Sequence, residues 1–231
     1  MIEYNKIQTI FKRDEHNIII PGEFTWPEFE LLKDIKWQCT EKIDGTNTSI
    51  HIIPTESGYE VEFHGRTERA QMPPHLLKRL EELFPYDKLI DVFTEGGTKD
   101  FTEPIILYGE GYGAKIQKGG NYIKNGCDFI LFDIKIGRWW LERLALEEIA
   151  EKLGIKVVPY IGDMTIAEAC DFVDKGFKST IAENPDYDAE GLVLKAPYGL
   201  LLRNGGRLMT KIKSCDFRQL RVKNMRKDIS A

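Results

Sequence analysis

This sequence lacks several features that would assign a protein to a class from its sequence alone. It has no run of about 18 apolar residues, so no helical membrane span is expected. Its opening residues, 1–6, lack the apolar core of a signal peptide. The four cysteines, Cys39, Cys127, Cys170 and Cys215, form no C-x-x-C pair, and no partnered histidines accompany them. This pattern argues against a zinc site and for the reducing cytoplasm as the location.

Internal repeats, low-complexity tracts and Ser/Gly linkers are missing as well. With 231 residues, the chain is long enough to bury the core of one large domain. We therefore expect residues 1–231 to form a single domain that ends in a basic segment, residues 216–231.

The charges are unevenly distributed along the chain. The net charge of −5 by itself speaks against nucleic acid as a partner. Residues 195–231, however, contain ten Lys or Arg and two Asp or Glu, a local charge of +8, so the preceding 194 residues carry −13. This asymmetry indicates an acidic body with one cationic face or tail, although a solvated basic helix has the same composition.

Hydrophobic periodicity predicts strands in pairs or threes, with helices that do not alternate regularly with them. The expected strands are 37–40, 49–53, 59–63, 104–110, 129–134, 157–159, 189–195 and 208–213. The expected helices are 27–33, 75–84, 88–93, 141–153, 166–175 and 216–227, and residues 111–126 are expected to form a polar glycine-rich loop. This order favours an α+β fold of antiparallel sheets flanked by helices over a doubly wound fold.

One stretch, Glu41-Lys42-Ile43-Asp44-Gly45-Thr46-Asn47, lies at a junction between two expected strands. Its polar groups and its glycine make a poor core but a good place to hold a phosphate. A lysine can act there as a nucleophile only if it loses its proton. Because only about one lysine in a few thousand is unprotonated at neutral pH, such a lysine must be desolvated or surrounded by other cations.

Lys211 and Lys213 are candidates for those cations. They stand two apart on an expected strand, so their side chains share one face while Thr210 and Ile212 point to the other. Two ammonium groups there would favour the uncharged amine of Lys42 and neutralise charge on a transferring phosphoryl group. A solvated lysine stripe on an exposed strand is the alternative.

Other candidate residues for a nucleotide site stand at strand ends. Glu110 and Glu190 are each beside a glycine, where a carboxylate can hold Mg²⁺ or accept a hydrogen bond from a ribose hydroxyl; a solvated strand end is the alternative. Phe129 and Phe132, three apart on a strand, face opposite ways, so at most one can stack on a purine base. Arg66 can grip a phosphate bidentately or lie free on the surface.

Taken in order, these motifs resemble the collinear series of the covalent nucleotidyltransferase superfamily of ligases and capping enzymes. The fit is best to ATP-dependent RNA ligases of the RNA ligase 2 type and spans about residues 37–217. The series consists of Lys42-Ile43-Asp44-Gly45-Thr46-Asn47, Gly65-Arg66-Thr67, Tyr108-Gly109-Glu110, Phe132-Asp133-Ile134, Glu190-Gly191-Leu192-Val193-Leu194-Lys195 and Lys211-Ile212-Lys213.

The resemblance implies an adenylation domain with an ATP pocket between its sheets, and Mg²⁺ or Mn²⁺ as the metal. It also implies a role for each site residue. For the reaction itself, Lys42 is implied to be the nucleophile that becomes AMP-lysine, and Glu190 to bind the metal. For the nucleoside, Glu41 would read the adenine edge, Phe132 would stack on adenine, Glu110 would contact the ribose, and Asp44 would belong to the same site. For the phosphates, Asn47 would lie near the α-phosphate or its metal, Arg66 would contact phosphate, Lys211 and Lys213 would hold the triphosphate, and Lys195 would assist with phosphate or the RNA end.

Two departures from the family pattern matter. Asp44 stands where RNA ligase 2 members can carry histidine and where DNA ligases and capping enzymes carry aspartate, so the motif alone does not fix the polynucleotide. About eighteen residues follow Lys213, too few for the OB-fold or helical domain that usually comes next. Engagement of a nicked duplex would then depend on the basic segment or on a partner protein that supplies the missing domain. The basic residues of that segment are Arg218, Arg221, Lys223, Arg226 and Lys227.

We therefore expect an ATP-dependent RNA ligase, of the kind used in RNA repair, that acts on 5′-phosphate and 3′-hydroxyl RNA ends. The alternatives within enzymes are a minimal DNA ligase core and a capping guanylyltransferase. From a different class, a non-catalytic RNA-end-binding module could have kept the fold and lost turnover.

Overall fold

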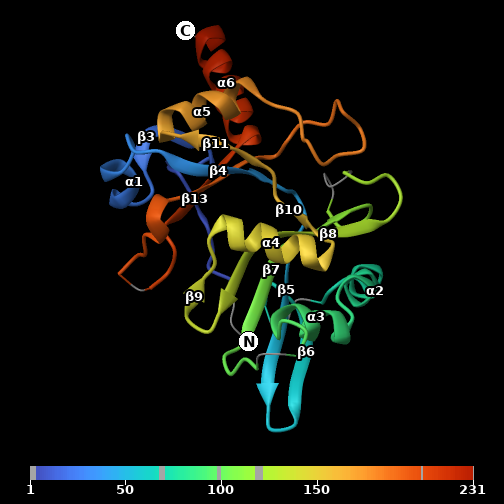
Figure 1. The fold of residues 1–231 in the computed structure, drawn as a ribbon. Helices are drawn as coiled ribbons and strands as arrows, with labels where there is room; N and C mark the ends of the chain where they lie inside the picture. The colour runs from blue at the N-terminus through green and yellow to red at the C-terminus, as the bar shows by residue number, and fades with distance from the viewer. Residues whose placement is uncertain (1–3, 68–70, 98–99, 118–121, 204, 231) are drawn as a thin grey trace. The chain divides into compact units, whose positions relative to one another are not determined.

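The computed structural model describes residues 4–67, 71–97, 100–117, 122–203 and 205–230, and their side chains up to residue 225. Internal packing divides the chain into two compact units, whose elements are shown in Figure 1. Unit 1 comprises Met1–Tyr4 and Asp44–Val158, and unit 2 comprises Asn5–Ile43 and Pro159–Ala231. The single domain expected from the sequence stays a prediction.

Unit 2 is built on a five-stranded sheet in the order β1-β13-β12-β4-β11. All neighbouring strands are antiparallel except β1 and β13, which run parallel. The strands are β1 (Gln8–Thr9), β4 (Trp37–Lys42), β11 (Tyr160–Met164), β12 (Gly191–Lys195) and β13 (Met209–Lys213). The other elements are the hairpin of β2 (Phe11–Arg13) and β3 (Ile19–Phe24), the helices α1 (Pro27–Leu31), α5 (Ile166–Lys175) and α6 (Ser214–Ser230), and the short 3₁₀ helix η1 (Pro197–Gly199).

Alternate residues of the unit 2 strands supply its core. Trp37 and Cys39 of β4, Leu192 and Leu194 of β12, and Ile212 of β13 are buried in one cluster. Helix α5 covers this cluster with apolar side chains of its own, namely Ile166, Ala169 and Val173. A capping box formed by Thr165 and Glu168 starts α5.

Unit 1 is built on a sheet in the order β10-β8-β7-β5-β6, with β9 paired to β8. Neighbours are antiparallel except β10 and β8. The strands are β5 (Thr46–Thr55), β6 (Gly58–Gly65), β7 (Ile105–Gly113), β8 (Cys127–Ile136), β9 (Trp139–Trp140) and β10 (Lys156–Val157). The helices are α2 (Pro74–Leu83), α3 (Tyr86–Phe93) and α4 (Arg143–Leu153).

One face of the unit 1 sheet packs against its helices. Ile50 and Ile52 of β5, Leu107 of β7, and Phe129 and Leu131 of β8 share a buried cluster with leucines of the helices. The opposite face of β5 therefore carries the residues in between, whose side chains are polar. Burial of alternate residues fixes the register of these strands, because a shift by one residue would turn the polar set into the core.

The predicted α+β fold with antiparallel sheets and flanking helices is confirmed. The expectation of a polar loop over residues 111–126 is wrong in part: β7 continues to Gly113, and Tyr112 and Tyr122 are fully buried with their rings 5.8 Å apart, edge to face. Residues 118–121 of that stretch lie outside the described residues. Among the helices described, none is long and apolar enough to cross a bilayer.

Candidate active site

Lys42 is the last residue of β4 and lies in one row with two residues of the neighbouring strands. It pairs with Gly191 of β12, and Gly191 pairs in turn with Lys213 of β13. Paired residues of an antiparallel sheet point to the same face, so the side chains of Lys42 and Lys213 share a face of the sheet. Two strand spacings place their Cα atoms about 10 Å apart.

The carboxylate of Glu190 bridges these two lysines. Its Oε2 accepts a hydrogen bond from Lys42 Nζ at 2.6 Å, and its Oε1 lies 2.8 Å from Lys213 Nζ. Burial of Lys213 works against its charged form, but the hydrogen bond and attraction of Glu190 outweigh this, so the pKa of Lys213 is raised above its ordinary value. A carboxylate, rather than another cation, is therefore in direct contact with the Lys42 amine.

Two further lysines occupy the same face of the sheet. Lys211 pairs with Val193 on β12, and Lys195 pairs with Gln38 on β4. On each strand these residues stand an even number of positions from the row that contains Lys42, so their side chains point to the same face. On the opposite face Thr210 is fully buried and Ile212 belongs to the core. The prediction that Lys211 and Lys213 share a face is thus confirmed.

Glu41 lies on the core side of β4 and is 1% exposed. Its Oε2 accepts hydrogen bonds from the backbone N–H of Thr180 at 3.2 Å and from the Thr180 hydroxyl at 3.4 Å. Its Oε1 is buried and has no hydrogen-bond partner among the described residues. Burial raises the pKa of this carboxyl above its ordinary value. A buried acceptor of this kind is costly unless a donor, such as an exocyclic amine, completes it.

In unit 1, the residues after Lys42 are fixed to β7. Asn47 of β5 pairs directly with Glu110 of β7. Gly45 approaches β7 so closely that a Cβ atom would lie 2.3 Å from the carbonyl oxygen of Gly111, so a larger residue would displace the strand. The backbone N–H of Asp44 donates to the hydroxyl of the buried Tyr122 at 3.0 Å.

Phe132 lies at an irregularity between β7 and β8. Tyr108 pairs with Asp133 and Gly109 with Leu131, so Phe132 is the extra residue of a β-bulge. Bulges of this kind turn a side chain to a new direction and are common next to active sites. The ring of Phe132 contacts that of Tyr4 at 5.0 Å, whereas Phe129 is fully buried in the core. The prediction that the two phenylalanines face opposite ways is confirmed.

The predicted site residues thus form two sets, one in unit 2 and one in unit 1. In the sequence, Ile43 stands between Lys42 of the first set and Asp44 of the second. Arg66 follows β6 directly, is exposed, and belongs to the second set. Unit 2 holds Glu41, Lys42, Glu190, Lys195, Lys211 and Lys213, and unit 1 holds Asp44, Asn47, Arg66, Glu110 and Phe132.

A model of the RNA ligase family matches residues 35–213, which include both sets. The chain belongs to the RNA ligase family. No curated protein matches the chain. The RNA ligase of Naegleria gruberi with PPi is a similar solved structure, with a TM-score of 0.62 and 20% identity over 94% of this chain and 57% of that one.

Variants of the same Naegleria gruberi RNA ligase show the same similarity. One with ATP and Mn has a TM-score of 0.61, and one with AMP and Mn has a TM-score of 0.60. Both are 20% identical over 94% of this chain and 57% of theirs. This likeness shows a shared fold, and the chain spans little more than half the length of these ligases.

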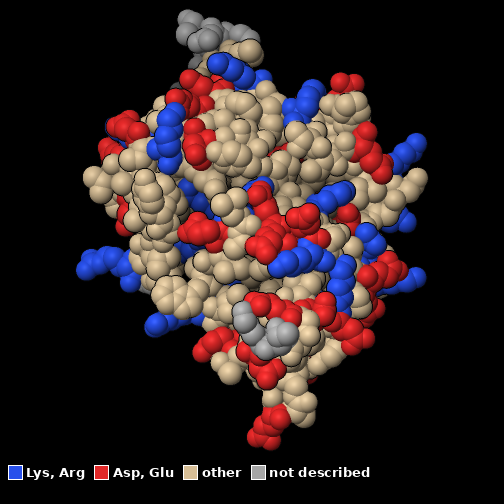
Figure 2. All heavy atoms as spheres, viewed as in Figure 1, with Lys and Arg blue, Asp and Glu red and all other residues tan. Residues whose placement is uncertain are grey.

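Part of the basic C-terminal segment of this RNA ligase family member is engaged within unit 2. Arg221 pairs with Asp174, and Lys223 lies near Asp14. The side chains of Arg226 and Lys227 lie outside the described residues. Figure 2 shows acidic and basic side chains interspersed over the visible face. Intramolecular pairing of this kind reduces the positive charge that the segment can offer to phosphates.

Sequence reasoning missed three residues that hold the site residues in place. Tyr122 fixes the backbone of Asp44, Thr180 hydrogen-bonds Glu41, and Tyr4 packs on Phe132. A strand pattern gives no signal for Thr180, which is 139 residues from Glu41. Tyr122 stands in the glycine-rich stretch that was read as a polar loop, and its aromatic side chain was the one available signal.

Proposed function

We propose that the chain is an ATP-dependent RNA ligase that works in three steps. The amine of Lys42 attacks the α-phosphorus of ATP, the bond to the β-phosphate breaks, and pyrophosphate leaves. AMP then passes from Lys42 to the 5′-phosphate of an RNA end. Finally a 3′-hydroxyl attacks that phosphate and AMP leaves. The observation that carries the proposal is the Glu190 carboxylate between the amines of Lys42 and Lys213 in a member of the RNA ligase family.

The structure supports distinct tasks for the unit 2 residues. Glu190 must release the Lys42 ammonium before the amine can act, and its two oxygens are then free for another cation. Its two carboxylate oxygens suit Mg²⁺ or Mn²⁺, and such an ion, when bound, supplies positive charge to the phosphates. Lys211 and Lys213, on the face of Lys42, would hold the phosphates as charge develops on them. Lys195 would assist with phosphate or the RNA end.

The residues of unit 1 would bind the rest of the nucleotide. Asn47 and Glu110 are paired neighbours, which suits contacts to adjacent parts of one ligand, the α-phosphate and the ribose. Asp44 would belong to the same nucleotide site. Phe132, which faces away from the core cluster that holds Phe129, would stack on adenine, and the exposed Arg66 would contact phosphate.

The RNA substrate and its location are part of the same proposal. We expect the ends to be a 5′-phosphate and a 3′-hydroxyl of RNA, sealed in the cytoplasm. Because several basic residues of α6 pair within unit 2, a partner protein that contributes a further RNA-binding domain would strengthen engagement of the ends.

A comparison of nucleotide donors tests this function. The purified chain is incubated in separate reactions with α-labelled ATP, α-labelled GTP and adenylate-labelled NAD, each with Mg²⁺ and with Mn²⁺, and then denatured. We expect a label that resists denaturation with ATP alone. A covalent label from GTP would indicate a capping guanylyltransferase, and one from NAD a different ligase class. No label with any donor, under conditions where the protein is folded and binds RNA ends, would favour a non-catalytic end-binding module.

Glu41→Gln is expected to weaken the preference for ATP over GTP. The unpartnered Oε1 of Glu41 can accept a hydrogen bond from the adenine amine, and guanine presents a carbonyl oxygen at that position. A glutamine that presents its amide N–H₂ there would lose this contact, at a cost of about 1–3 kcal/mol, or about 5- to 150-fold in selectivity. The ratio of labelling rates with ATP and GTP measures the effect.

The folded state of the same variant provides the control. Glu41→Gln replaces a buried carboxylate whose Oε1 accepts no hydrogen bond from the described residues, so it should not lower the midpoint of thermal unfolding. An unchanged ATP preference in this folded variant would show that Glu41 does not read the base.

A further inference from the structure

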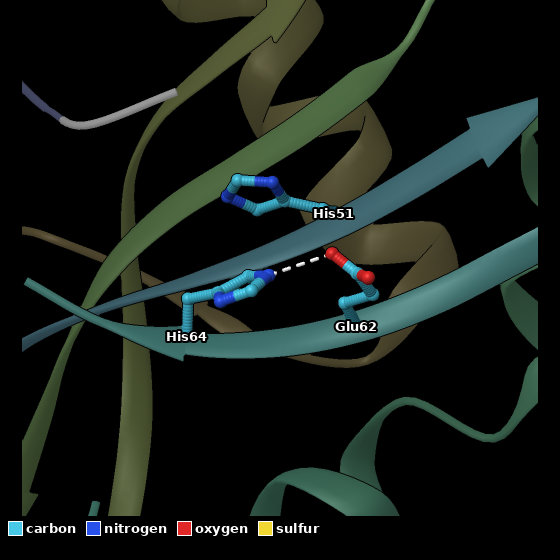
Figure 3. A group of neighbouring side chains, drawn as sticks. All are labelled: His51, Glu62 and His64. Carbon is cyan, nitrogen blue, oxygen red and sulfur yellow. Dashed lines mark hydrogen bonds and ion pairs between the residues drawn. The ribbon is translucent and has the colours of Figure 1, made fainter. Parts of the chain in front are cut away.

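A cluster of two histidines and a glutamate lies on the unit 1 hairpin of β5 and β6, and none of its three members is assigned to the ligase site. Ser49 pairs with His64, and His51 pairs with Glu62, so all four side chains lie side by side on one face of the hairpin. Figure 3 shows Glu62 and His64 turned toward each other on β6, with His51 of β5 beside them. The register of the hairpin, rather than any local sequence motif, brings them together.

The spacing of the three potential ligands is close to that of a metal site. Of the residues that the structure describes, His51, Glu62 and His64 form the one such group of His, Cys, Asp or Glu, with all ligand atoms within 4.8 Å of one another. A tetrahedral ion with bonds of about 2.0–2.1 Å separates its ligands by about 3.4 Å. The widest separation between ligand atoms therefore needs to close by at most about 1.4 Å, within the reach of side-chain rotation.

The hydrogen bonds of the cluster also match those of a metal site. Glu62 Oε2 lies 2.7 Å from His64 Nε2, so two potential ligand atoms already face each other. His51 Nε2 lies 2.9 Å from the Ser49 hydroxyl. In zinc sites a ligating histidine commonly donates a hydrogen bond from the N–H of its other ring nitrogen to a neighbouring acceptor, which fixes the orientation of the ring.

The environment of His51 favours the form of histidine that binds metals. His51 is 3% exposed. Burial, followed by the charge of the adjacent His64, lowers the pKa of His51 to about 4. A neutral imidazole with a free lone pair is the ligating form.

We propose that His51, Glu62 and His64 bind one transition-metal ion of the Zn²⁺ type, with the fourth position open to water or another small ligand. Two imidazoles and one carboxylate suit Zn²⁺ and its neighbours Co²⁺ and Ni²⁺, whereas Mg²⁺ prefers oxygen ligands. The cysteine pattern argued against a zinc site and found no partnered histidines. The hairpin brings together two histidines that are thirteen residues apart in the sequence, with ring centroids 4.5 Å apart.

The test uses the full chain without a histidine tag, titrated with Co²⁺ in excess Mg²⁺. Visible absorbance of Co²⁺ reports the coordination geometry, and Zn²⁺ is then added as a competitor. We expect one equivalent of Co²⁺ to bind with the strong visible bands of a four-coordinate ion and to be displaced by Zn²⁺. Calorimetry of the same titration should give a stoichiometry of one ion per chain.

Variants of the partly exposed ligands carry the decisive comparison. Glu62→Gln and His64→Gln are expected to weaken Co²⁺ binding by at least about 100-fold, and Ser49→Ala by about 10- to 100-fold. The matched control is the double variant His16→Gln and His75→Gln, which removes the two other histidines, both exposed, and should bind as the parent does. Far-UV circular dichroism confirms that each variant is folded.

Two results would overturn the proposal. One is the lack of stoichiometric Co²⁺ binding by the folded parent, and the other is binding that survives both Glu62→Gln and His64→Gln. A Lys42→Ala variant should bind Co²⁺ as the parent does. The metal site and the ligase function can therefore fail independently.

Discussion

Lys42→Ala is expected to abolish the transfer of labelled AMP from ATP to the protein, a loss of at least about 1,000-fold. The Lys42 amine is the group proposed to form the phosphoramidate bond, whereas Glu190 offers only carboxylate oxygens, which contact the amines of Lys42 and Lys213. Labelling followed by denaturing electrophoresis measures the loss.

A stricter variant separates charge from nucleophilicity. Lys42→Arg keeps a cation beside Glu190 but cannot readily act as a nucleophile, so it should fail to the same degree. Lys33→Ala, which removes an exposed lysine of the same unit, should label as the parent does. If Lys42→Arg took up AMP at the parental rate, another residue would be the acceptor.

The RNA substrate distinguishes the first step from the last. When the RNA end already carries AMP, the amine of Lys42 has no bond to form, so Lys42→Ala should still seal pre-adenylylated RNA. The same variant should fail with 5′-phosphorylated RNA and ATP. Failure with both substrates would indicate that Lys42 is needed to hold the RNA end, or that the chain lacks a surface for it.

The sequence was most informative where the chemistry follows from short-range spacing. Alternation along β13 predicted that Lys211 and Lys213 share a face, and the same rule separated Phe129 from Phe132. The order of the motifs predicted the family, which the match over residues 35–213 confirms. Each of these inferences needs only the period of a strand or the order of motifs.

Features that depend on long-range pairing were not predictable from the sequence. Glu190 and Lys42 are 148 residues apart, and the family resemblance implies that they share one site; the structure brings them together, but the direct hydrogen bond from the Lys42 amine to the carboxylate was not predicted. The pairing of His51 with Glu62 depends on where the hairpin turns, at Glu56 and Ser57 between β5 and β6, which a pattern of apolar residues leaves open. Strand register decides both cases.

Glu190→Gln is expected to lower the rate of AMP transfer to Lys42 by at least about 100-fold. The substitution keeps the shape of the side chain but removes the charge that faces both lysines, and with it the oxygen pair proposed for the metal. Glu23→Gln, which neutralises an exposed glutamate of unit 2, is the matched control. A parental rate in Glu190→Gln would remove Glu190 from the reaction.

The stability of the same variant should depend on pH in a defined direction. Glu190 raises the pKa of Lys213 in the folded state above its unfolded value near 10.5. The stabilisation is therefore fully present below that pH and is lost as the pH rises through the folded pKa. The lysines are 19% and 30% exposed, between surface and buried pairs, so the loss in Glu190→Gln at neutral pH should be about 1–3 kcal/mol.

Urea unfolding of the parent and of Glu190→Gln, at neutral pH and above about pH 11, measures this difference. The difference in free energy of unfolding between the two proteins should be largest at neutral pH. It should become smaller at alkaline pH, because Lys213 of the parent then loses the proton whose charge Glu190 stabilises. A gap that stays constant with pH would show that Glu190 stabilises the fold by packing. In that case its role in transfer would have to be argued from the kinetics alone.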